Sequence, residues 1–251
     1  MRFLRLFADA ALFGQSPLAN PLQKVAQKIL RGPRKVSFRM RGGLADGMLF
    51  SCLSSHRYFF VREEYESDLI SPLKRFVSPG SVVADVGAHF GYWALGLARI
   101  CGSSGMVFAF EPSPENRNWL LENLQINSIS NVYIIPLAVS DTQGIATISD
   151  DGSMCKLSSG AIEVETTTMD KFCETNPIPD FMLIDVEGFA GNVLRGSAAS
   201  FREKFIPVIC EIHHNQEWDE FRSFMEGQSA QIQILGSRSR LPFRALAHRS
   251  R

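Results

Sequence analysis

Two patterns of hydrophobic positions divide the chain at about residue 78. After that point, short apolar runs alternate with longer segments in which apolar and polar residues mix. Short apolar runs are typical of buried strands and the mixed segments of helices, so the alternation predicts βαβ units and a doubly wound, mostly parallel α/β sheet. The predicted strands are 81–85, 106–110, 132–136, 181–185, 206–212 and 231–235, the predicted helices are 91–100, 114–127, 169–174 and 218–226, and a hairpin is expected within the polar stretch 140–168.

The chain before residue 78 has a different pattern. Residues 1–35 are helix-forming, but they are interrupted at Pro17 and Pro21 and end at Gly32-Pro33. Short strand-like runs follow at 36–40, 48–52 and 58–61, with a helix over 68–76. We therefore expect an N-terminal helical appendage over 1–35, lead-in strands and a helix over 36–77, the α/β domain over 78–237 and a basic C-terminal tail over 238–251.

Charge is distributed unevenly, although the formal net charge is zero. Residues 1–41 hold nine Lys or Arg and one acid, residues 238–251 hold five Arg and no acid, and the residues between them hold 12 basic and 25 acidic side chains. This acidic central region disfavours nucleic acid as a partner, because phosphate binding needs Lys and Arg clustered on the binding face. The basic ends leave a peripheral contact with an anionic membrane or another partner open.

The cysteines and the lengths of the apolar runs bear on the compartment. The five Cys include no C-x-x-C pair and no Cys/His ligand spacing, and an odd count leaves at least one Cys unpaired in a monomer. No apolar run approaches the roughly 20 residues of a membrane-spanning helix. A reducing cytoplasm is the expected location.

The segment Asp85-Val-Gly-Ala-His-Phe-Gly91 has the clearest ligand-binding pattern. A buried strand ends in an acid, turns at Gly87 and enters a helix after Gly91, so a ligand can approach bare backbone at a helix N-terminus. A dinucleotide fingerprint, G-x-G-x-x-G, would have a glycine where His89 stands. The Asp85 carboxylate would repel a pyrophosphate but attract the ammonium and sulfonium groups of S-adenosylmethionine. The pattern therefore favours S-adenosylmethionine over a nicotinamide dinucleotide.

Glu111 supports the same choice of cofactor. It directly follows the second predicted strand and lies twenty residues past Gly91. Doubly wound nucleotide sites place an acid there to bind ribose hydroxyls. Pro112 and Pro114 then lead into the next helix, with Ser113 as its cap.

Acids and imidazoles also follow the fourth and fifth predicted strands. Asp185 and Glu187 close the fourth strand, and His213 follows Glu211 at the end of the fifth. The ligand crevice of such a sheet lies at the switch in strand order, between the first and fourth strands here, so these groups are expected beside the sulfonium. They would orient the cofactor, accept a substrate proton or hold a divalent cation, and His213 is a candidate general base. The candidate catalytic residues are Asp185, Glu187 and His213; no metal ligand is assigned, and Mg²⁺ is left open as a second cofactor.

These segments, in this order, resemble the FkbM-type methyltransferases. The resemblance covers about residues 60–215. It rests on Asp85-Val-Gly-Ala-His-Phe-Gly91, Phe110-Glu-Pro-Ser-Pro-Glu-Asn116, Ala138-Val-Ser-Asp141 with Gly144, Thr166-Thr-Thr-Met-Asp170, Ile184-Asp-Val-Glu-Gly188, Leu194-Arg-Gly196 and Glu211. Two positions depart from the family's pattern, His89 in place of the common Asn and Leu183 in place of a frequent Lys.

The resemblance implies a class I methyltransferase fold, which is Rossmann-like, and O-methylation of a hydroxyl on a sugar, glycan or secondary metabolite. The expected cofactor contacts are Asp85, Gly87, Ala88, His89, Gly91, Glu111, Pro112, Ser113, Ala138 and Asp185. Two other functions stay open. One is a non-catalytic module of this fold that binds a membrane or partner through its basic termini; the other is an NAD-dependent oxidoreductase, which Asp85 and the missing glycine disfavour.

Overall fold

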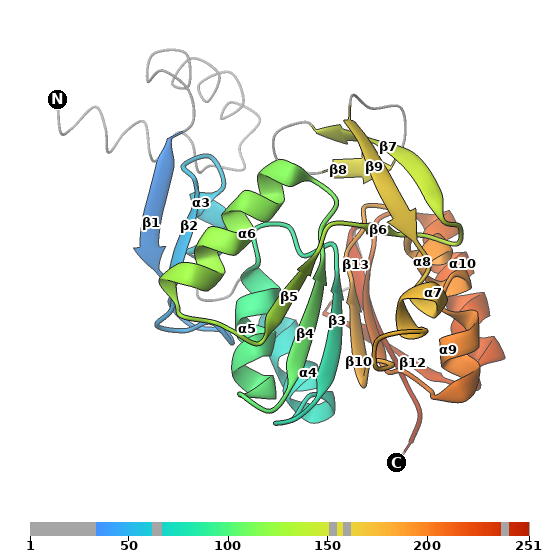
Figure 1. Cartoon of the computed structure of the whole chain (residues 1–251). Coiled ribbons are helices and arrows are strands. Elements are labelled where there is room, and N and C mark those ends of the chain that lie inside the picture. The colour runs from blue at the N-terminus through green and yellow to red at the C-terminus, as the bar shows by residue number, and fades with distance from the viewer. Residues whose placement is uncertain (1–33, 62–66, 151–154, 158–161, 237–240, 251) are drawn as a thin grey trace, which may run out of the picture.

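A seven-stranded sheet forms the centre of the computed structural model, which describes residues 34–61, 67–150, 155–157, 162–236 and 241–250 (Figure 1). In spatial order its strands are β12 (Gln231–Leu235), β13 (Phe243–His248), β11 (Val208–Ile212), β10 (Phe181–Ile184), β3 (Val82–Val86), β4 (Met106–Phe110) and β5 (Val132–Ile135). The five strands from β11 to β5 are parallel, and β13 is antiparallel to both of its neighbours. The prediction of a doubly wound, mostly parallel sheet is confirmed, and so is the pairing of the first and fourth strands, β3 and β10.

Helices cover both faces of this sheet (Figure 1). One face carries α4 (Ile70–Phe76), α5 (Tyr92–Cys101) and α6 (Pro114–Ile126); the other carries α7 (Met169–Cys173), α8 (Ala190–Arg195), α9 (Ala198–Glu203) and α10 (Asn215–Gly227). Successive strand residues pack on opposite faces, so Val83 lies in the apolar cluster with α5 and Ala84 in the cluster with α10. All four residues of β10 are buried, as expected for a parallel strand between two helical layers.

A two-stranded antiparallel sheet, β1 (Lys35–Arg39) and β2 (Leu49–Leu53), lies beside α6. The Asn123 amide on α6 accepts from the backbone N–H of Ser51 at 2.7 Å and donates to its carbonyl at 3.0 Å. These bonds satisfy backbone groups that a strand edge would otherwise leave unpaired. The lead-in sheet is thereby fixed to the helix that follows β4.

The segment after β2 is helical. The strand predicted at 58–61 is wrong, because Arg57–Phe60 form a single turn, α3, and Phe60 packs against Phe50 with ring centroids 4.6 Å apart. A four-residue apolar run does not distinguish a strand from a buried helical turn by its periodicity. The helix predicted over 68–76 is confirmed by a 3-10 turn, η1 (Ser67–Leu69), and α4.

A second, smaller sheet follows β5. Its strands lie in the order β6 (Ala138–Val139), β9 (Ile162–Thr167), β7 (Gly144–Asp150) and β8 (Cys155–Leu157). Because β7 is antiparallel to both β8 and β9, the hairpin predicted within 140–168 is confirmed. Ala138, Ile148 and Val164 form a small apolar cluster of their own beneath it.

The C-terminal part of the chain differs from the prediction. Residues predicted as a basic tail over 238–251 include β13, which lies between β11 and β12 with Ala245, Leu246 and Ala247 buried. The arginines at the end of the chain hid this strand in the charge pattern, although four of its six residues are apolar or aromatic. Helices α8 and α9 were not predicted.

The N-terminal segment and the lengths of the helices bear on the predicted membrane contact. Residues 1–33 of the predicted helical appendage lie outside the described residues. Among the residues that are described, no helix is both long and apolar enough to cross a membrane.

Candidate active site

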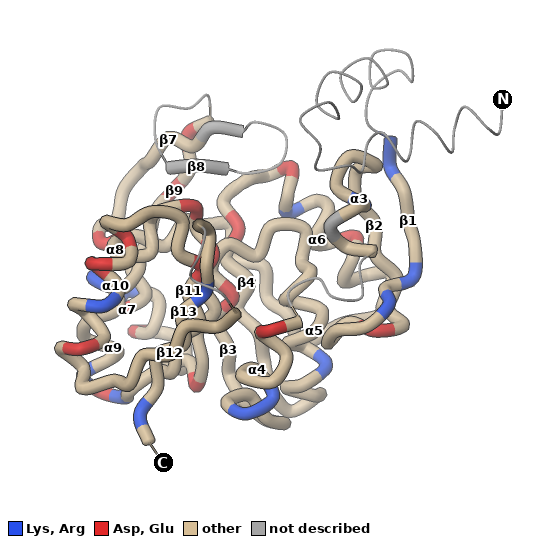
Figure 2. The backbone as a smooth tube through the Cα atoms, turned by 180° about the vertical axis from the view of Figure 1, so that it is seen from behind, with Lys and Arg blue, Asp and Glu red and all other residues tan. Residues whose placement is uncertain are grey.

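Four parallel strands bring the predicted site residues to one edge of the central sheet. Asp85 lies near the end of β3, Glu111 directly follows β4, Asp185 directly follows β10, and His213 directly follows β11. The carboxyl ends of parallel strands meet at one edge, and the switch in strand order between β3 and β10 is where ligands of such sheets bind. Figure 2 marks several acidic positions close together beside the ends of β11 and β4.

The loop after β3 is packed tightly against its neighbours. The backbone N–H of Gly87 donates to the carbonyl of Phe110 at 3.0 Å. Gly87 has φ +94°, and a Cβ at this position would meet the carbonyl oxygen of Asp185 at 1.9 Å. Gly91, with φ +89°, would likewise place a Cβ 2.4 Å from Cδ1 of Leu120. Both glycines therefore make room for neighbouring segments of the chain, a reason for glycine that the ligand-binding interpretation did not include.

Glu111 is held by N–H donors on both sides. One carboxylate oxygen accepts from the backbone N–H of His89 at 2.8 Å, and the other accepts from the Ser113 N–H at 2.9 Å and the Asn116 amide at 3.2 Å. The residue is 3% exposed, and burial raises the pKa of its carboxyl although these hydrogen bonds act in the opposite direction. A carboxylate has about four lone-pair positions, so this one has a fixed orientation and room for one further donor. Ser113 also caps α6, as predicted.

Aromatic rings surround the His89 position. His89 adopts a left-handed backbone conformation, with φ +50°, and its ring stacks on Phe90 with centroids 3.9 Å apart. The buried ring of His56 meets Phe90 edge-on at 5.3 Å, and burial lowers the pKa of His56. Left-handed backbone at a residue other than glycine is uncommon and is found at binding sites.

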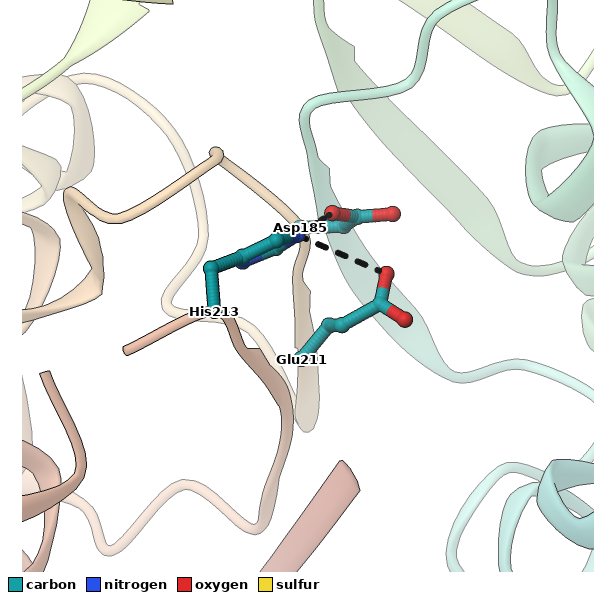
Figure 3. Close-up of side chains that lie close together, drawn as sticks. All are labelled: Asp185, Glu211 and His213. Carbon is teal, nitrogen blue, oxygen red and sulfur yellow. Dashed lines mark ion pairs between the residues drawn. The ribbon is translucent and has the colours of Figure 1, made fainter. Parts of the chain in front are cut away.

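Asp185, Glu187, Glu211 and His213 form one group, called the acidic cluster below. Figure 3 shows Asp185 and Glu211 pointing toward the ring of His213 from two neighbouring strands. The distances from His213 Nε2 are 3.6 Å to Asp185 Oδ1, 3.6 Å to Glu187 Oε2 and 3.9 Å to Glu211 Oε2. Asp185 is the most exposed member, with 37% of its side chain accessible, and the others are more deeply enclosed. The cluster therefore opens to solvent on the Asp185 side.

A fourth carboxylate, Glu217, lies behind His213. Its oxygens accept from the backbone N–H of His213 at 2.7 Å and of Ala190 at 3.0 Å, and Oε2 lies 3.6 Å from His213 Nδ1. Burial acts to raise the pKa of Glu217, but its hydrogen bonds outweigh this and lower it. Burial likewise acts to lower the pKa of His213, yet Glu217, Glu187 and Glu211 together raise it. The imidazole is thus enclosed by carboxylates on both ring nitrogens.

Arg244 on β13 reaches the other side of Glu211. Its guanidinium lies 3.0 Å from Glu211 Oε1 and 3.6 Å from Asp68 Oδ1. One Glu211 oxygen is thus paired with a cation, and the other faces His213.

A shallow groove of about 590 Å³ lies elsewhere, at the amino end of β3 and β10. Its lining includes Ser78, Ser81, Asp180, Phe205 and Arg249, and none of the predicted site residues. Sheets of this kind bind ligands beyond the carboxyl ends of their strands, so the groove leaves the site assignment unchanged.

A comparison of the sequence with known families covers the same part of the chain as this site. A family model described as the methyltransferase FkbM domain matches residues 85–232, which is more than half of the chain. The chain belongs to this family. The resemblance drawn from the sequence motifs is thereby confirmed, and the matched FkbM domain includes every predicted site residue.

The chain is also similar to a named relative and to solved structures. Hexuronic acid methyltransferase AglP from Haloferax volcanii is 30% identical over 157 residues, which are 59% of this chain and 62% of AglP. Methyltransferase FkbM from Methylobacillus flagellatus KT is 14% identical, covers 78% of this chain and 54% of its own, and superposes with a TM-score of 0.54. Precorrin-6y C5,15-methyltransferase from Geobacter metallireducens GS-15 is 12% identical over 74% of this chain and 89% of its own, with a TM-score of 0.51.

These comparisons differ in what they support. At such low identities the two solved structures support the fold alone, and they confirm the class I methyltransferase fold. The chain spans less than two thirds of both AglP and the Methylobacillus protein.

Three residues of the site were missed by sequence reasoning: His56, Glu217 and Arg244. His56 and Arg244 lie outside the 85–232 match and reach the site only through tertiary packing. Glu217 left a signal, since it lies four residues after His213, but the helix was predicted to begin one residue later. The helix in fact begins at Asn215, and the His214 side chain caps it by accepting from the Glu217 N–H.

Ala138 is the predicted cofactor contact that belongs to the small sheet. It is buried in β6, where it packs with the apolar cluster of the small sheet. Its contact with a cofactor stays a prediction.

Proposed function

We propose that this FkbM domain binds S-adenosylmethionine and transfers its methyl group to a hydroxyl oxygen of a sugar. The main support is the hydrogen bond from the His89 N–H to Glu111, which joins the loop after β3 to the acid after β4. These are the two segments from which both the family and the physical argument expect cofactor binding. A loop and an acid that fix one another form a pre-organised site, so little ordering is left for binding itself.

The carboxylates at this edge fit S-adenosylmethionine chemically. Glu111 has room for one further donor, which a ribose hydroxyl would supply. Asp85 is 2% exposed, whereas Asp185 is more open to solvent. The site therefore offers one buried and one solvent-facing carboxylate for the cofactor's ammonium and sulfonium charges. Gly87, Ala88, His89, Gly91, Pro112 and Ser113 are the backbone positions expected to line the cofactor.

Methyl transfer would depend on position and on one proton. When bound, S-adenosylmethionine supplies an electrophilic methyl group on its sulfonium sulfur. The residues around it hold the acceptor hydroxyl in line and shield it from water, which is where most of the rate acceleration of such a transfer arises. Asp185, Glu187 and His213 are the groups proposed to receive the hydroxyl proton, since they follow β10 and β11, beside the switch between β3 and β10.

The proposed acceptor is a hydroxyl of a hexuronic acid or a related sugar. Its support is AglP, which is named as a hexuronic acid methyltransferase and is 30% identical to this chain over 157 residues. The cytoplasmic location and a peripheral membrane contact through the basic ends stay predictions from the sequence.

Calorimetric titration with S-adenosylhomocysteine tests the cofactor half of the proposal. We expect the wild-type protein to bind it and not NADH, and Asp85→Ala to lose binding while remaining folded. Transfer of labelled methyl groups to glucuronides then tests the acceptor, with neutral glucosides as the comparison. A folded wild-type protein that binds NADH alone, or neither compound, would remove the proposed function.

A further inference from the structure

Three side chains of the acidic cluster bring metal-binding atoms close together. Asp185 Oδ1 and Glu211 Oε2 lie 3.6 and 3.9 Å from His213 Nε2, and donor atoms of all three residues lie within 4.8 Å of one another. These separations are too long for hydrogen bonds, which lie near 3 Å. Two ligands with metal bonds of about 2.1 Å are about 3.0 Å apart at a right angle and about 3.4 Å apart at a tetrahedral angle. The two distances from His213 Nε2, 3.6 and 3.9 Å, exceed the tetrahedral separation by about 0.2 and 0.5 Å, so the two carboxylates would move inward to share a cation with the imidazole.

The ring of His213 is oriented for such a role. Its Nδ1 lies 3.6 Å from Oε2 of Glu217, an ion-pair rather than a hydrogen-bond distance, and the Glu217 side chain is fully buried and accepts from the backbone N–H groups of His213 and Ala190. Metal-binding histidines usually have a carboxylate or carbonyl at the other ring nitrogen, which fixes the tautomer and the orientation of the ring. With Nδ1 turned toward Glu217, Nε2 is the ring nitrogen that faces the oxygens of Asp185 and Glu211.

The charge around this imidazole is strongly negative. Carboxylates of Asp185, Glu187, Glu211 and Glu217 lie within 3.9 Å of its nitrogens, whereas Arg244 faces the far oxygen of Glu211. Carboxylates gathered around one imidazole and partly shielded from water repel one another more strongly than in bulk solvent. A dication at the centre of the cluster would turn this repulsion into attraction.

We propose that Asp185, Glu211 and His213 bind a divalent first-row transition-metal ion, with Glu217 as the residue that positions His213. The imidazole in the donor set selects against Mg²⁺ and Ca²⁺, which prefer all-oxygen ligands, while the two carboxylates suit Mn²⁺ or Fe²⁺. The solvent-facing side at Asp185 leaves coordination positions for an external ligand.

The role of the ion rests on the proposed function, and with Asp185 and His213 bound to the ion, Glu187 is the group left to receive the hydroxyl proton. A hexuronic acid carries a carboxylate, which the acidic cluster alone would repel. A cation held by Asp185, Glu211 and His213 would reverse this repulsion and bind the acceptor through its carboxylate or hydroxyl oxygens. The ion is thus the group that makes an anionic sugar compatible with an acidic site.

Titration with Mn²⁺, followed by the loss of the free-ion paramagnetic resonance signal, tests the site on purified protein carrying S-adenosylhomocysteine. We expect one bound Mn²⁺ per chain. Asp185→Asn should weaken Mn²⁺ binding about a hundredfold, and Glu217→Gln about tenfold, the range typical when the partner of a metal-binding histidine is lost. The affinity for S-adenosylhomocysteine should not change in Glu217→Gln.

Two variants keep the test informative. Asp219→Asn is the matched control, since it removes an exposed carboxylate of α10 that pairs with Arg222 outside the cluster, and it should bind Mn²⁺ like the wild type. Glu211→Gln, which retains an oxygen for Arg244, replaces Asp185→Asn if that variant does not fold.

The outcomes separate the metal site from the methyltransferase proposal. A protein that binds S-adenosylhomocysteine but no Mn²⁺ would overturn the metal site and leave the proposed function standing. Equal weakening in Asp219→Asn would show binding to general surface charge, and displacement of Mn²⁺ by equimolar Mg²⁺ would contradict the transition-metal class. Mn²⁺ binding without binding of S-adenosylhomocysteine would retain the site and remove the proposed function.

Discussion

Glu111 and the acidic cluster lie at the same edge of the sheet but are held in different ways. Glu111 is buried and accepts two backbone N–H bonds and one amide bond from residues within 22 positions of it in the chain. The members of the acidic cluster lie at or just after the ends of β10 and β11, are partly exposed and contact one another through their charged side chains. Backbone donors move little, whereas charged side chains can reorient around what binds.

This difference separates the two halves of the proposed reaction. A cofactor of constant structure suits the rigid Glu111 position, because pre-organised donors cost little to order. An acceptor or an ion has to enter and leave. The acidic cluster suits such a ligand because it opens to solvent at Asp185. The same fold therefore provides one fixed and one adjustable carboxylate site about the β3–β10 switch.

The largest effect should come from changing Glu111, the carboxylate fixed by backbone donors. Glu111→Gln replaces one acceptor oxygen by an NH₂ group that faces the N–H donors of His89 or Ser113. We expect the affinity for S-adenosylhomocysteine to fall by about 1.5–3 kcal/mol, the usual value of hydrogen bonds to a charged group. Calorimetry measures the loss. Glu115→Gln, which changes an exposed carboxylate in the first turn of α6, is the control. Wild-type affinity in Glu111→Gln would show that this carboxylate is structural only.

A smaller effect should come from a carboxylate that is fixed equally well but lies away from the edge. Asp170 on α7 accepts from the backbone N–H groups of Ala199 and Ser200, at 2.9 and 2.7 Å, at the start of α9. Asp170→Ala should lower the free energy of unfolding by about 1 kcal/mol, as loss of a helix cap does. Binding of S-adenosylhomocysteine and Mn²⁺ should be unchanged. Urea unfolding measures the first effect, and a large loss of binding would contradict the division between scaffold and site.

The smallest effect should appear in the pH dependence of stability without cofactor. The pKa of Glu111 is raised in the folded protein, so the folded state holds its proton at pH values where the unfolded chain, with a pKa of about 4.3, has lost it. The free energy of unfolding should therefore contain a contribution that decreases as the pH rises from about 4.3 through the folded pKa. Urea midpoints of wild type and Glu111→Gln, measured over this range, should differ in slope. Parallel slopes would refute the prediction.

The sequence predicted the parallel half of the fold closely because its signals are local. Buried strands such as Met106–Phe110, followed by a helix cap at Ser113, are specified by residues close together in the chain. The glycines at 87 and 91 marked the loop, but the neighbours that require them, Asp185 and Leu120, lie on other elements. Reasoning from one segment gave the right residues and an incomplete account of them.

The errors share a physical origin in tertiary contacts. The run at 58–61 forms a helical turn because Phe60 packs on Phe50. The basic residues at 238–251 predicted a tail, because the pairing of β13 with β11 and β12 cannot be seen in the charge pattern. In the acidic cluster, Asp185 and His213 could be predicted from their places at strand ends. Glu217 and Arg244 could not, because their roles depend on where α10 and β13 meet β11.

The position of β13 has a consequence for how the protein is made. Residues 243–248 pair with β11 on one side and β12 on the other, so this half of the sheet cannot close until almost the whole described chain has left the ribosome. Before then, β11 and β12 each present an open edge, the kind of surface that invites mispairing between nascent chains. Arg244 arrives with the same strand and supplies the cation that faces Glu211. A fragment ending at residue 232 would contain the entire FkbM match and still lack both the closing strand and that charge.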